Sequence, residues 1–286
     1  MKKVLILGST GMLGHQVFYK LNSLNDFEIF DISFRNQLRK ESIICDITNL
    51  EKLEKLIFKF EPDFIINCVG VLIKGSSDHP ANAIFINAYF PHWLANTAGS
   101  VSAKVIHIST DCVFSGKSGA YKETDFRDAD DIYGRSKALG EINDSEHLTL
   151  RTSIVGPELK ANGEGLFHWF MHQRNEINGY KKSFWGGVTT VELSNVIAYC
   201  LKRDCVGLIN ITNGERISKF DLLKSFQKHF NKELKIHPVN GKEIDKSLKS
   251  EKEDFNYFVP SYSEMIHEMK IFMEENHKLY QTIYNF

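Results

Sequence analysis

Val4-Leu5-Ile6-Leu7-Gly8-Ser9-Thr10-Gly11-Met12-Leu13-Gly14 is the stretch that decides the fold. Its four apolar residues run without a polar break, which is typical of a strand buried on both faces, as in a parallel sheet. Glycines follow at positions 8, 11 and 14, and apolar residues then recur at roughly helical spacing as far as Leu21. A strand, a glycine turn and a helix in this order are the context in which proteins bind a dinucleotide.

The three glycines have separate roles in such a turn. Gly8 allows a backbone conformation that other residues avoid, Gly11 lets a pyrophosphate approach, and Gly14 lets the helix pack closely on the strand. The N-terminus of the helix offers unpaired N–H groups and a partial positive charge to phosphate. A tight turn that binds nothing is the alternative. The cofactor-binding residues predicted here are Gly8, Thr10, Gly11, Met12, Leu13 and Gly14.

The composition excludes several classes of protein. The chain has 286 residues, 42% of them hydrophobic, which is enough for one large domain or two small ones. Its formal net charge of −1 argues against non-specific binding to nucleic acid, which needs a basic face. No apolar run approaches the roughly 20 residues of a membrane span. The five cysteines form no Cys-x2-Cys pair, so we expect a reduced, cytoplasmic protein without a metal site.

Strand-like and helix-like segments alternate through the first half of the chain. Apolar strands are expected at 28–34, 64–70, 104–108 and 148–151, a further short strand closes at 45–47, and helices are expected at 50–60, at 81–98 and from 133. This alternation predicts an α/β fold, a Rossmann-like doubly wound parallel sheet over residues 1–155. Residues 156–286 are expected to form a smaller substrate-binding lobe, with some segments returning to the sheet. Within this lobe, residues 242–254 read as a mobile surface segment and 262–280 as a final amphipathic helix.

Three residues carry the predicted chemistry. Thr110 directly follows a predicted strand, which places it at the functional edge of such a sheet. Tyr133 and Lys137 are four apart and therefore share a helix face. Reduction of a carbonyl needs an acid for the forming alkoxide, and a nearby ammonium lowers the pKa of a tyrosine from about 10. We therefore predict that Tyr133 is the acid and that Thr110 donates a hydrogen bond to the carbonyl oxygen. Lys137 is predicted to lower the pKa of Tyr133 and to bind the cofactor. Each motif alone is also common on ordinary helices and turns.

In combination these motifs resemble those of extended short-chain dehydrogenase/reductases, in particular the dTDP-4-dehydrorhamnose reductase family. The matching segments are 8–14, 109–116, 123–125, 133–137, 140–141 and 150–153, all within the first 155 residues. The resemblance implies that Thr110, Tyr133 and Lys137 are catalytic. It also implies that Asn87 helps to hold the lysine and an active-site water, with an ordinary polar helix residue as the alternative.

The cofactor follows partly from the end of the second predicted strand. An acidic residue there would favour NAD, but the strand ends at Arg35, and a guanidinium suits a 2′-phosphate. We therefore expect NADPH to be preferred, with NADH also usable. The resemblance implies that Asp46 and Ile47 lie at the adenine, and that Val69 and Gly70 lie near the middle of the cofactor.

The resemblance implies reduction of the C4 keto group of a nucleotide-linked 4-keto-6-deoxy sugar, for surface polysaccharide precursors. The family usually has tyrosine where Cys112 stands, and the ending after residue 242 differs, so a dTDP-linked sugar and a UDP-linked 2-acetamido analogue both fit. An epimerase or dehydratase of the same superfamily, or a non-catalytic NADP-binding regulatory subunit, are the alternatives. A homodimer is compatible with the sequence. Substrate-binding residues are predicted at Asp111, Cys112, Thr152, Trp185 and Val188, although Trp185 also fits a buried tryptophan beside a turn.

Overall fold

The computed structural model describes residues 1–284 and divides them into two compact units. The larger unit contains residues 1–114, 126–151 and 194–209. The smaller unit contains residues 115–125 and 152–193 and the described chain from Asn210 onward. The chain therefore crosses between the units several times. The sequence predicted a boundary at residue 155 with some later segments returning to the sheet, and residues 194–209 belong to the larger unit. The short insertion of residues 115–125 into the smaller unit was not predicted.

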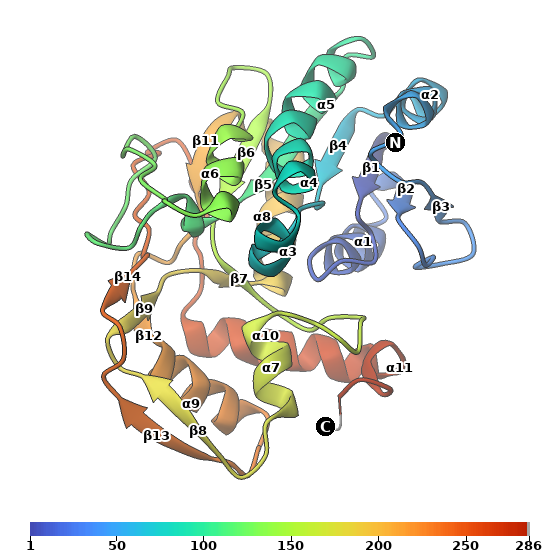
Figure 1. The fold of residues 1–286 in the computed structure, drawn as a ribbon. Coiled ribbons are helices and arrows are strands. Elements are labelled where there is room, and N and C mark those ends of the chain that lie inside the picture. The colour runs from blue at the N-terminus through green and yellow to red at the C-terminus, as the bar shows by residue number, and fades with distance from the viewer. Residues whose placement is uncertain (285–286) are drawn as a thin grey trace. The chain divides into compact units, whose positions relative to one another are not determined.

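A seven-stranded sheet forms the centre of the larger unit (Figure 1). Its strands are β1 (Lys2–Leu7), β2 (Phe27–Ser33), β3 (Ile43–Ile44), β4 (Phe64–Asn67), β5 (Lys104–Ser109), β6 (Leu148–Arg151) and β11 (Gly207–Asn210). The strand order is β11-β6-β5-β4-β1-β2-β3, and the pairs from β6 to β3 are parallel. The predicted doubly wound parallel sheet is confirmed.

The helices of the larger unit follow the predicted alternation with one difference. They are α1 (Gly14–Leu24), α2 (Leu50–Phe60), α3 (Ile73–Asp78), α4 (Pro80–Ile84), α5 (Phe90–Gly99), α6 (Ile132–Leu139) and most of α8 (Thr190–Arg203). The helix predicted over 81–98 is interrupted by a π-helical turn, η1 (Phe85–Tyr89), between α4 and α5. Such turns are rare and occur frequently at functional sites.

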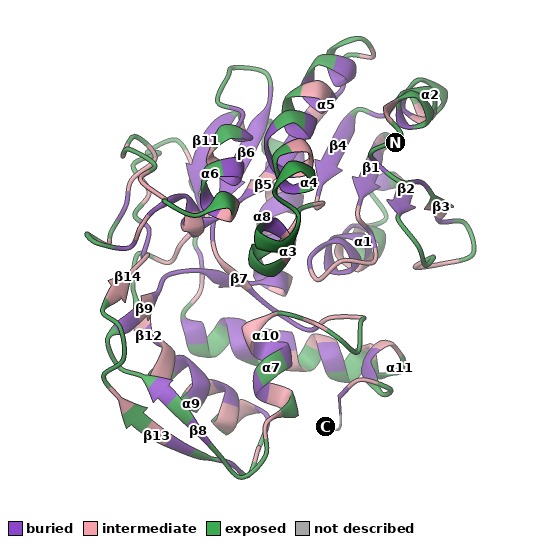
Figure 2. Cartoon of the chain, in the orientation of Figure 1, coloured by how far each residue is buried: buried purple, intermediate pink, exposed green. Residues whose placement is uncertain are grey.

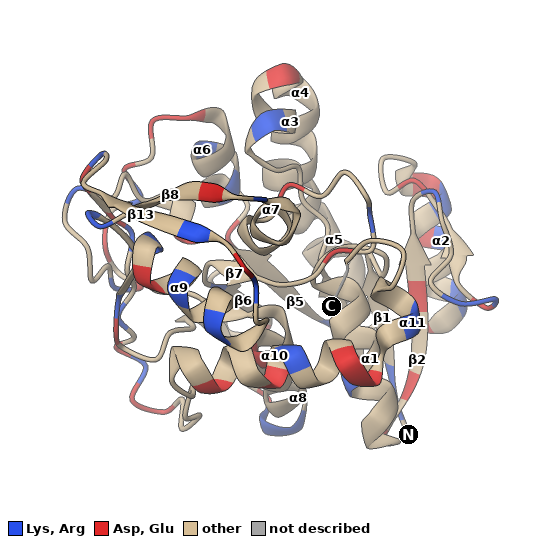
Figure 3. Ribbon diagram, turned by 90° about the horizontal axis from the view of Figure 1, so that it is seen from below, with Lys and Arg blue, Asp and Glu red and all other residues tan. Residues whose placement is uncertain are grey.

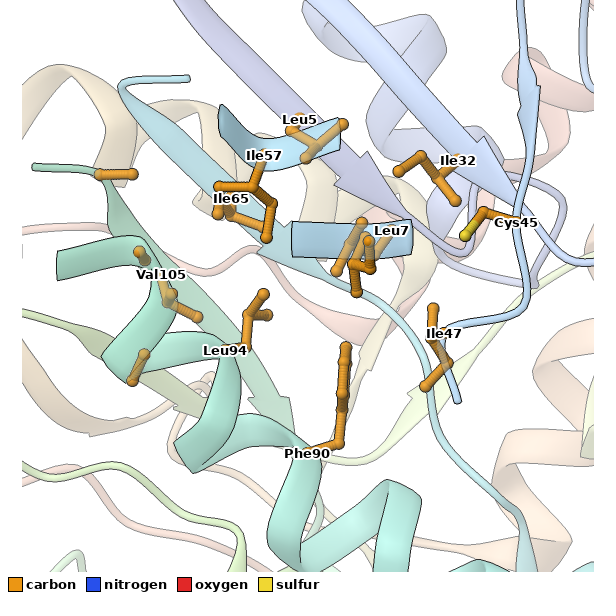
Figure 4. Packing of buried hydrophobic residues seen from close by; sticks show 14 of the residues in the cluster. Leu5, Leu7, Ile32, Cys45, Ile47, Ile57, Ile65, Phe90, Leu94 and Val105 are labelled. Carbon is orange, nitrogen blue, oxygen red and sulfur yellow. The ribbon is translucent and has the colours of Figure 1, made fainter. Parts of the chain in front are cut away.

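The core of this unit explains why the first strand is apolar throughout. Figure 2 shows the central strands as buried. Successive side chains of a strand point to opposite faces, so Leu5 and Leu7 lie on the face where one hydrophobic cluster also takes in Ile57 of α2 and Leu94 of α5 (Figure 4). Val4 and Ile6 point to the other face and are equally buried. A strand covered on both faces has no position for a polar side chain.

The smaller unit combines short strands with four helices along its described residues. Its elements are β7 (Ile154–Val155), α7 (Leu166–His172), β8 (Glu176–Tyr180), β9 (Ser183–Trp185), β10 (Val188–Thr189), β12 (Ile217–Ser218), α9 (Lys219–His229), β13 (Lys235–Val239), β14 (Ile244–Asp245), α10 (Tyr262–Glu275) and α11 (His277–Tyr280). They form small sheets of β10 with β7, β13 with β8, and β12-β9-β14.

The prediction of a mobile surface segment at residues 242–254 is wrong for residues 244–248. That segment contributes β14, which pairs with β9, and Leu248 bridges to Tyr121 and is buried. The predicted final helix is present but is divided into α10 and α11. Within residues 1–284, none of the helices is both long and apolar enough to span a bilayer. Figure 3 shows Lys and Arg mixed with Asp and Glu over the elements, as the small net charge leads one to expect.

Candidate active site

The larger unit has the strand order at which open α/β sheets bind ligands. The chain runs outward from β1 through β2 to β3, and then resumes on the other side of β1 with β4. Ligands bind outside the carboxyl ends of the strands at such a switch point. The loops that follow β1 and β4 lie together here, because a Cβ atom on Gly8 would be 3.1 Å from Cγ2 of Val69.

The glycine turn after β1 has the geometry that its spacing predicts. Gly8 has φ +84°, a conformation that favours glycine, and its N–H donates to the carbonyl of Ile32 at 2.8 Å. A Cβ atom on Gly14 would lie only 2.1 Å from the Gly8 carbonyl oxygen, so only glycine lets α1 pack this closely. The N-cap residue of α1 is Leu13, whose side chain cannot accept a hydrogen bond. The first N–H groups of the helix therefore suit a phosphate.

Two arginines lie near the end of β2. Arg35 is exposed, and its guanidinium stacks 4.7 Å from the centre of the Phe34 ring. Asp31 lies within β2, is buried, and accepts hydrogen bonds from Ser9 Oγ at 2.7 Å and from Arg39 Nε at 2.9 Å. Arg39 was not predicted as part of this region, since its partner is four residues before Arg35 and only the folded loop brings them together. Because Asp31 neutralises Arg39, Arg35 is the arginine better placed to receive an anion.

The predicted adenine and mid-cofactor residues differ in their exposure. The strand predicted at 45–47 is instead β3 (Ile43–Ile44), and Asp46 is an exposed turn residue whose Oδ1 accepts from the N–H and hydroxyl of Thr48. Ile47 is buried in the cluster of Figure 4, so only its backbone could meet a ligand. Val69 is half-buried, and its amide donates to Asn67 Oδ1 at 3.1 Å.

Thr110 and Tyr133 are brought together although 23 positions separate them in the chain. Thr110 follows β5 and caps a 3-10 turn, η2 (Asp111–Val113), by accepting from the N–H of Cys112 at 3.1 Å. Tyr133 is the second residue of α6, which Asp131 caps by accepting from the Gly134 N–H at 2.9 Å. The Thr110 side chain lies near enough to the Tyr133 hydroxyl to lower the pKa of that phenol.

Two glycines let α6 approach this turn. A Cβ atom on Gly134 would lie 2.2 Å from the carbonyl oxygen of Cys112, and one on Gly140 would lie 1.9 Å from the carbonyl oxygen of Asn87. Both distances are far below any real Cβ contact, so any other residue would push the helix away. The helix that carries Tyr133 is therefore held against η2 near its start and against η1 just past its end.

Lys137 and Asn87 lie next to the loop that follows β4. The Lys137 ammonium donates to the carbonyl of Ile108 at 2.7 Å, and a Cβ on Gly70 would be 3.7 Å from its Nζ. Asn87, in η1, accepts from the Val71 amide at 2.9 Å and donates to Ser136 Oγ at 3.2 Å. The π-helical turn thus ties the loop after β4 to α6. Burial lowers the pKa of Lys137 to about 8, although the carboxylate of Glu141 acts in the opposite direction.

The predicted effect of Lys137 on the acidity of Tyr133 is wrong for this structure. Burial is the largest influence and raises the pKa of Tyr133 above its ordinary value. Interactions with Cys112, Asp111 and Asp131 also raise it, and only the interaction with Thr110 lowers it. The sequence shows that a lysine lies on the same helix face, but it does not show how completely the phenol is removed from water.

A buried ion pair directly behind the site was missed. Arg151 at the end of β6 and Glu141 beyond α6 form two hydrogen bonds of 2.7 Å, and both side chains are fully buried. Ser109, the residue before Thr110, donates to the same carboxylate at 2.7 Å, and Arg127 donates at 2.9 Å. Burial alone would raise the pKa of Glu141, but these donors lower it overall. The sequence signal for this ion pair was the pair of motifs 140–141 and 150–153. Their role here is to fix the carboxyl end of β6 next to that of β5.

The predicted substrate residues fall into two groups. Asp111 and Cys112 belong to η2 beside Tyr133, where the Asp111 carboxylate accepts from the Thr110 hydroxyl at 3.1 Å. The remaining three are core residues of the smaller unit. Thr152 donates to the carbonyl of Ile211 at 2.8 Å, and the ring of Trp185 packs 5.6 Å from that of Tyr262. These two and Val188 are at most 6% exposed, which agrees with the buried-tryptophan alternative for Trp185, while contact of the three side chains with substrate stays a prediction.

Known proteins and a family model match most of the length of this chain. The family model described as RmlD substrate binding domain matches residues 1–255. The dTDP-4-dehydrorhamnose reductase of Aggregatibacter actinomycetemcomitans is 33% identical over 168 residues, which cover 57% of this chain and 54% of that protein. Methionine adenosyltransferase 2 subunit beta of Xenopus tropicalis is 29% identical over 247 residues, which cover 80% of this chain and 72% of that protein. The chain thus spans about half the length of the reductases that it matches.

Solved structures share the fold. A dTDP-4-dehydrorhamnose reductase from Bacillus anthracis str. Ames, determined in complex with NADP, superposes with a TM-score of 0.81. The alignment covers 95% of this chain and 99% of that one at 24% sequence identity. At this identity the match shows a common Rossmann-like architecture.

Proposed function

This chain belongs to the RmlD substrate binding domain family, and we propose that it reduces the C4 keto group of a nucleotide-linked 4-keto-6-deoxy sugar with NADPH. The reductases among its relatives supply the reaction class. The nucleotide is proposed to be dTDP or UDP, in the latter case on a 2-acetamido sugar. The reduced sugar would enter the synthesis of surface polysaccharide precursors.

One observation carries the proposal: the Thr110 side chain interacts with Tyr133, on the face of α6 that also carries Lys137. A ketone reductase needs a proton donor and a second donor that meet at one oxygen atom. The close approach permitted by Gly134 supplies this arrangement. The regulatory-subunit alternative does not need the tyrosine or the lysine, and both are present.

The raised pKa of Tyr133 keeps the phenol protonated at neutral pH, the form that reduction needs. A phenol that holds its proton at neutral pH can donate it to the oxygen at C4 as negative charge develops there. Thr110 would donate a hydrogen bond to the same oxygen, in place of the one that it donates to Asp111. Lys137, with a pKa of about 8, is mostly protonated at pH 7, so its charge would stabilise the alkoxide. NADPH, when bound, supplies the hydride.

The residues around the switch point fit a dinucleotide phosphate. The turn from Gly8 to Gly14 would hold the pyrophosphate, because Gly14 lets α1 begin directly against the turn, where the first N–H groups of the helix would bind phosphate. Arg35 would bind the 2′-phosphate and Asp46 would lie at the adenine. Asn87 and Gly70 would border the part of the cofactor nearest Lys137.

The site lacks one of the two acidic residues that dehydration of an intact nucleotide-hexose needs. The elimination needs a base for the C5 proton and an acid for the departing hydroxyl, and related 4,6-dehydratases resemble this chain but carry an Asp-Glu pair after the threonine. Asp111 is present, but Cys112 follows it, and a neutral thiol with an ordinary pKa of about 8.5 replaces a carboxylic acid poorly.

The decisive experiment follows NADPH absorbance with a panel of substrates. Oxidation of NADPH by a dTDP- or UDP-linked 4-keto-6-deoxy sugar, with the 4-hydroxy product found by mass, is the expected result. Loss of water from dTDP-glucose or UDP-N-acetylglucosamine with catalytic NAD would instead establish a dehydratase. Binding of NADP without turnover of any keto sugar would favour a regulatory subunit, in keeping with the relatives named methionine adenosyltransferase 2 subunit beta.

A further inference from the structure

Two cysteines lie at the connection between α8 and β11, away from the residues proposed for catalysis: Cys200 in the last turn of the helix and Cys205 just after it. The helix ends at Arg203, and Asp204 then has φ +54°, the left-handed conformation that commonly ends a helix. In this type of helix end, the residue after the left-handed one contacts a residue in the last turn of the helix. Here those two positions are Cys205 and Cys200, so the helix end itself brings two thiols together.

The structure shows the expected contact. A hydrogen bond joins the side chains of Cys200 and Cys205, and both thiols are reduced. Cys200 is 2% exposed, whereas Cys205 is half-buried and follows Asp204, whose side chain is almost fully exposed. Cys205 is therefore the more accessible of the two thiols.

We propose that Cys200 and Cys205 are a redox modification site that forms a reversible disulfide on exposure to hydrogen peroxide. The sulfur of Cys205 attacks one peroxide oxygen and breaks the O–O bond, giving a sulfenic acid and one water. The sulfur of Cys200 then attacks that of Cys205, the S–O bond breaks, and the hydroxide leaves with the Cys200 proton as a second water. The two thiols lose two electrons in total and the peroxide gains them.

The surroundings of the two sulfurs support this order of events. The hydrogen bond with Cys205 and burial raise the pKa of Cys200 above its ordinary value, so Cys200 keeps its proton until the sulfenic acid has formed. The ammonium of Lys104 lowers that pKa and lies at the same helix end, 2.8 Å from Asp204 Oδ1. Lys104 thus favours the negative sulfur that must attack in the second step.

The disulfide would fasten the end of α8 to the first residues before β11. That strand lies at one end of the sheet order, where a strand has a neighbour on one side only. We expect the covalent link to hold this edge in place under oxidising conditions and to release it when a thiol reductant is added.

The sequence provides a direct assay for the link. Lys202 and Arg203 lie between the cysteines, so trypsin separates Cys200 in peptide 183–202 from Cys205 in peptide 204–216. The full chain is treated with hydrogen peroxide, alkylated and digested. We expect the two peptides to appear joined and to separate with dithiothreitol, while the intact chain loses about two hydrogens in mass. Alkylation of both cysteines after treatment, or accumulation of sulfinic acid on Cys205 in the wild type, would overturn the proposal.

Two variants identify the pairing. Cys200→Ser is expected to abolish the link and to leave Cys205 as a sulfenic or sulfinic acid. Cys45→Ser, which alters a buried cysteine in the separate cluster of Figure 4, is the matched control and is expected to retain the link in full. A link that persists in Cys200→Ser through another cysteine would show that the pairing is wrong. Circular dichroism checks that both variants fold, and the wild-type result decides the proposal even if one variant does not.

Discussion

Replacing Gly134 by alanine tests whether close packing of α6 creates the active site. The added Cβ would lie 2.2 Å from the Cys112 carbonyl oxygen and 2.5 Å from the Ala129 Cβ, so the helix must retreat by about 1 Å to restore ordinary contact. This movement separates Tyr133 from Thr110. A displacement of this size at a reacting group costs on the order of 10²-fold in rate, and overpacking costs about 1–3 kcal/mol in stability.

Gly99, the last residue of α5, offers a matched control because a Cβ atom there would meet nothing within 4 Å. Gly99→Ala should leave the rate unchanged and alter stability by less than about 1 kcal/mol, in the favourable direction. The assay measures kcat and KM with NADPH and the keto sugar identified above, and urea denaturation gives the free energy of unfolding. A Gly134→Ala enzyme with wild-type kcat and stability would refute the packing argument.

Three further predictions concern single side chains. Tyr133→Phe removes the proton donor and little volume, so kcat should fall by about 10²–10⁴-fold while the dissociation constant for NADPH, measured by fluorescence titration, stays nearly the same; an unchanged kcat would remove Tyr133 from the role of acid. Arg35→Ala should raise KM for NADPH more than for NADH, and the ion-paired Arg39 makes Arg39→Ala the comparison; equal effects of Arg35→Ala on both cofactors would contradict the 2′-phosphate role. Glu141→Gln leaves the buried Arg151 without its counter-ion and should lower the free energy of unfolding by about 3–5 kcal/mol at pH 7. Because folding lowers the pKa of Glu141, its carboxylate contributes fully to the free energy of unfolding above the unfolded-state pKa of about 4.3, and this contribution is lost as the pH falls below that pKa. The free energies of unfolding of wild type and variant should therefore approach each other in acid. A difference in free energy of unfolding that stays constant with pH would show that the carboxylate charge is not its source.

The sequence alone predicted those features that depend on residues close together in the chain. The apolar run of β1, the glycine turn and α1 are encoded within residues 4–24, because burial on both faces and the conformational needs of the turn leave few choices of residue. The strand at 148–151 was predicted with the bounds that the structure shows. Tyr133 and Lys137 could be placed on one face because helical periodicity is a local property.

Only the tertiary structure decided which distant residues meet and how far water is excluded from them. The meeting of Thr110 with Tyr133 depends on the space that Gly134 leaves for η2, and a π-helical turn brings Asn87 to the loop after β4. Burial then overrides charge at Tyr133, whose pKa rises although a lysine is nearby, and it places Trp185 in the core of the smaller unit, a position that the sequence left open. Burial is the sum of contacts from all parts of the chain, so no local pattern of residues can state it.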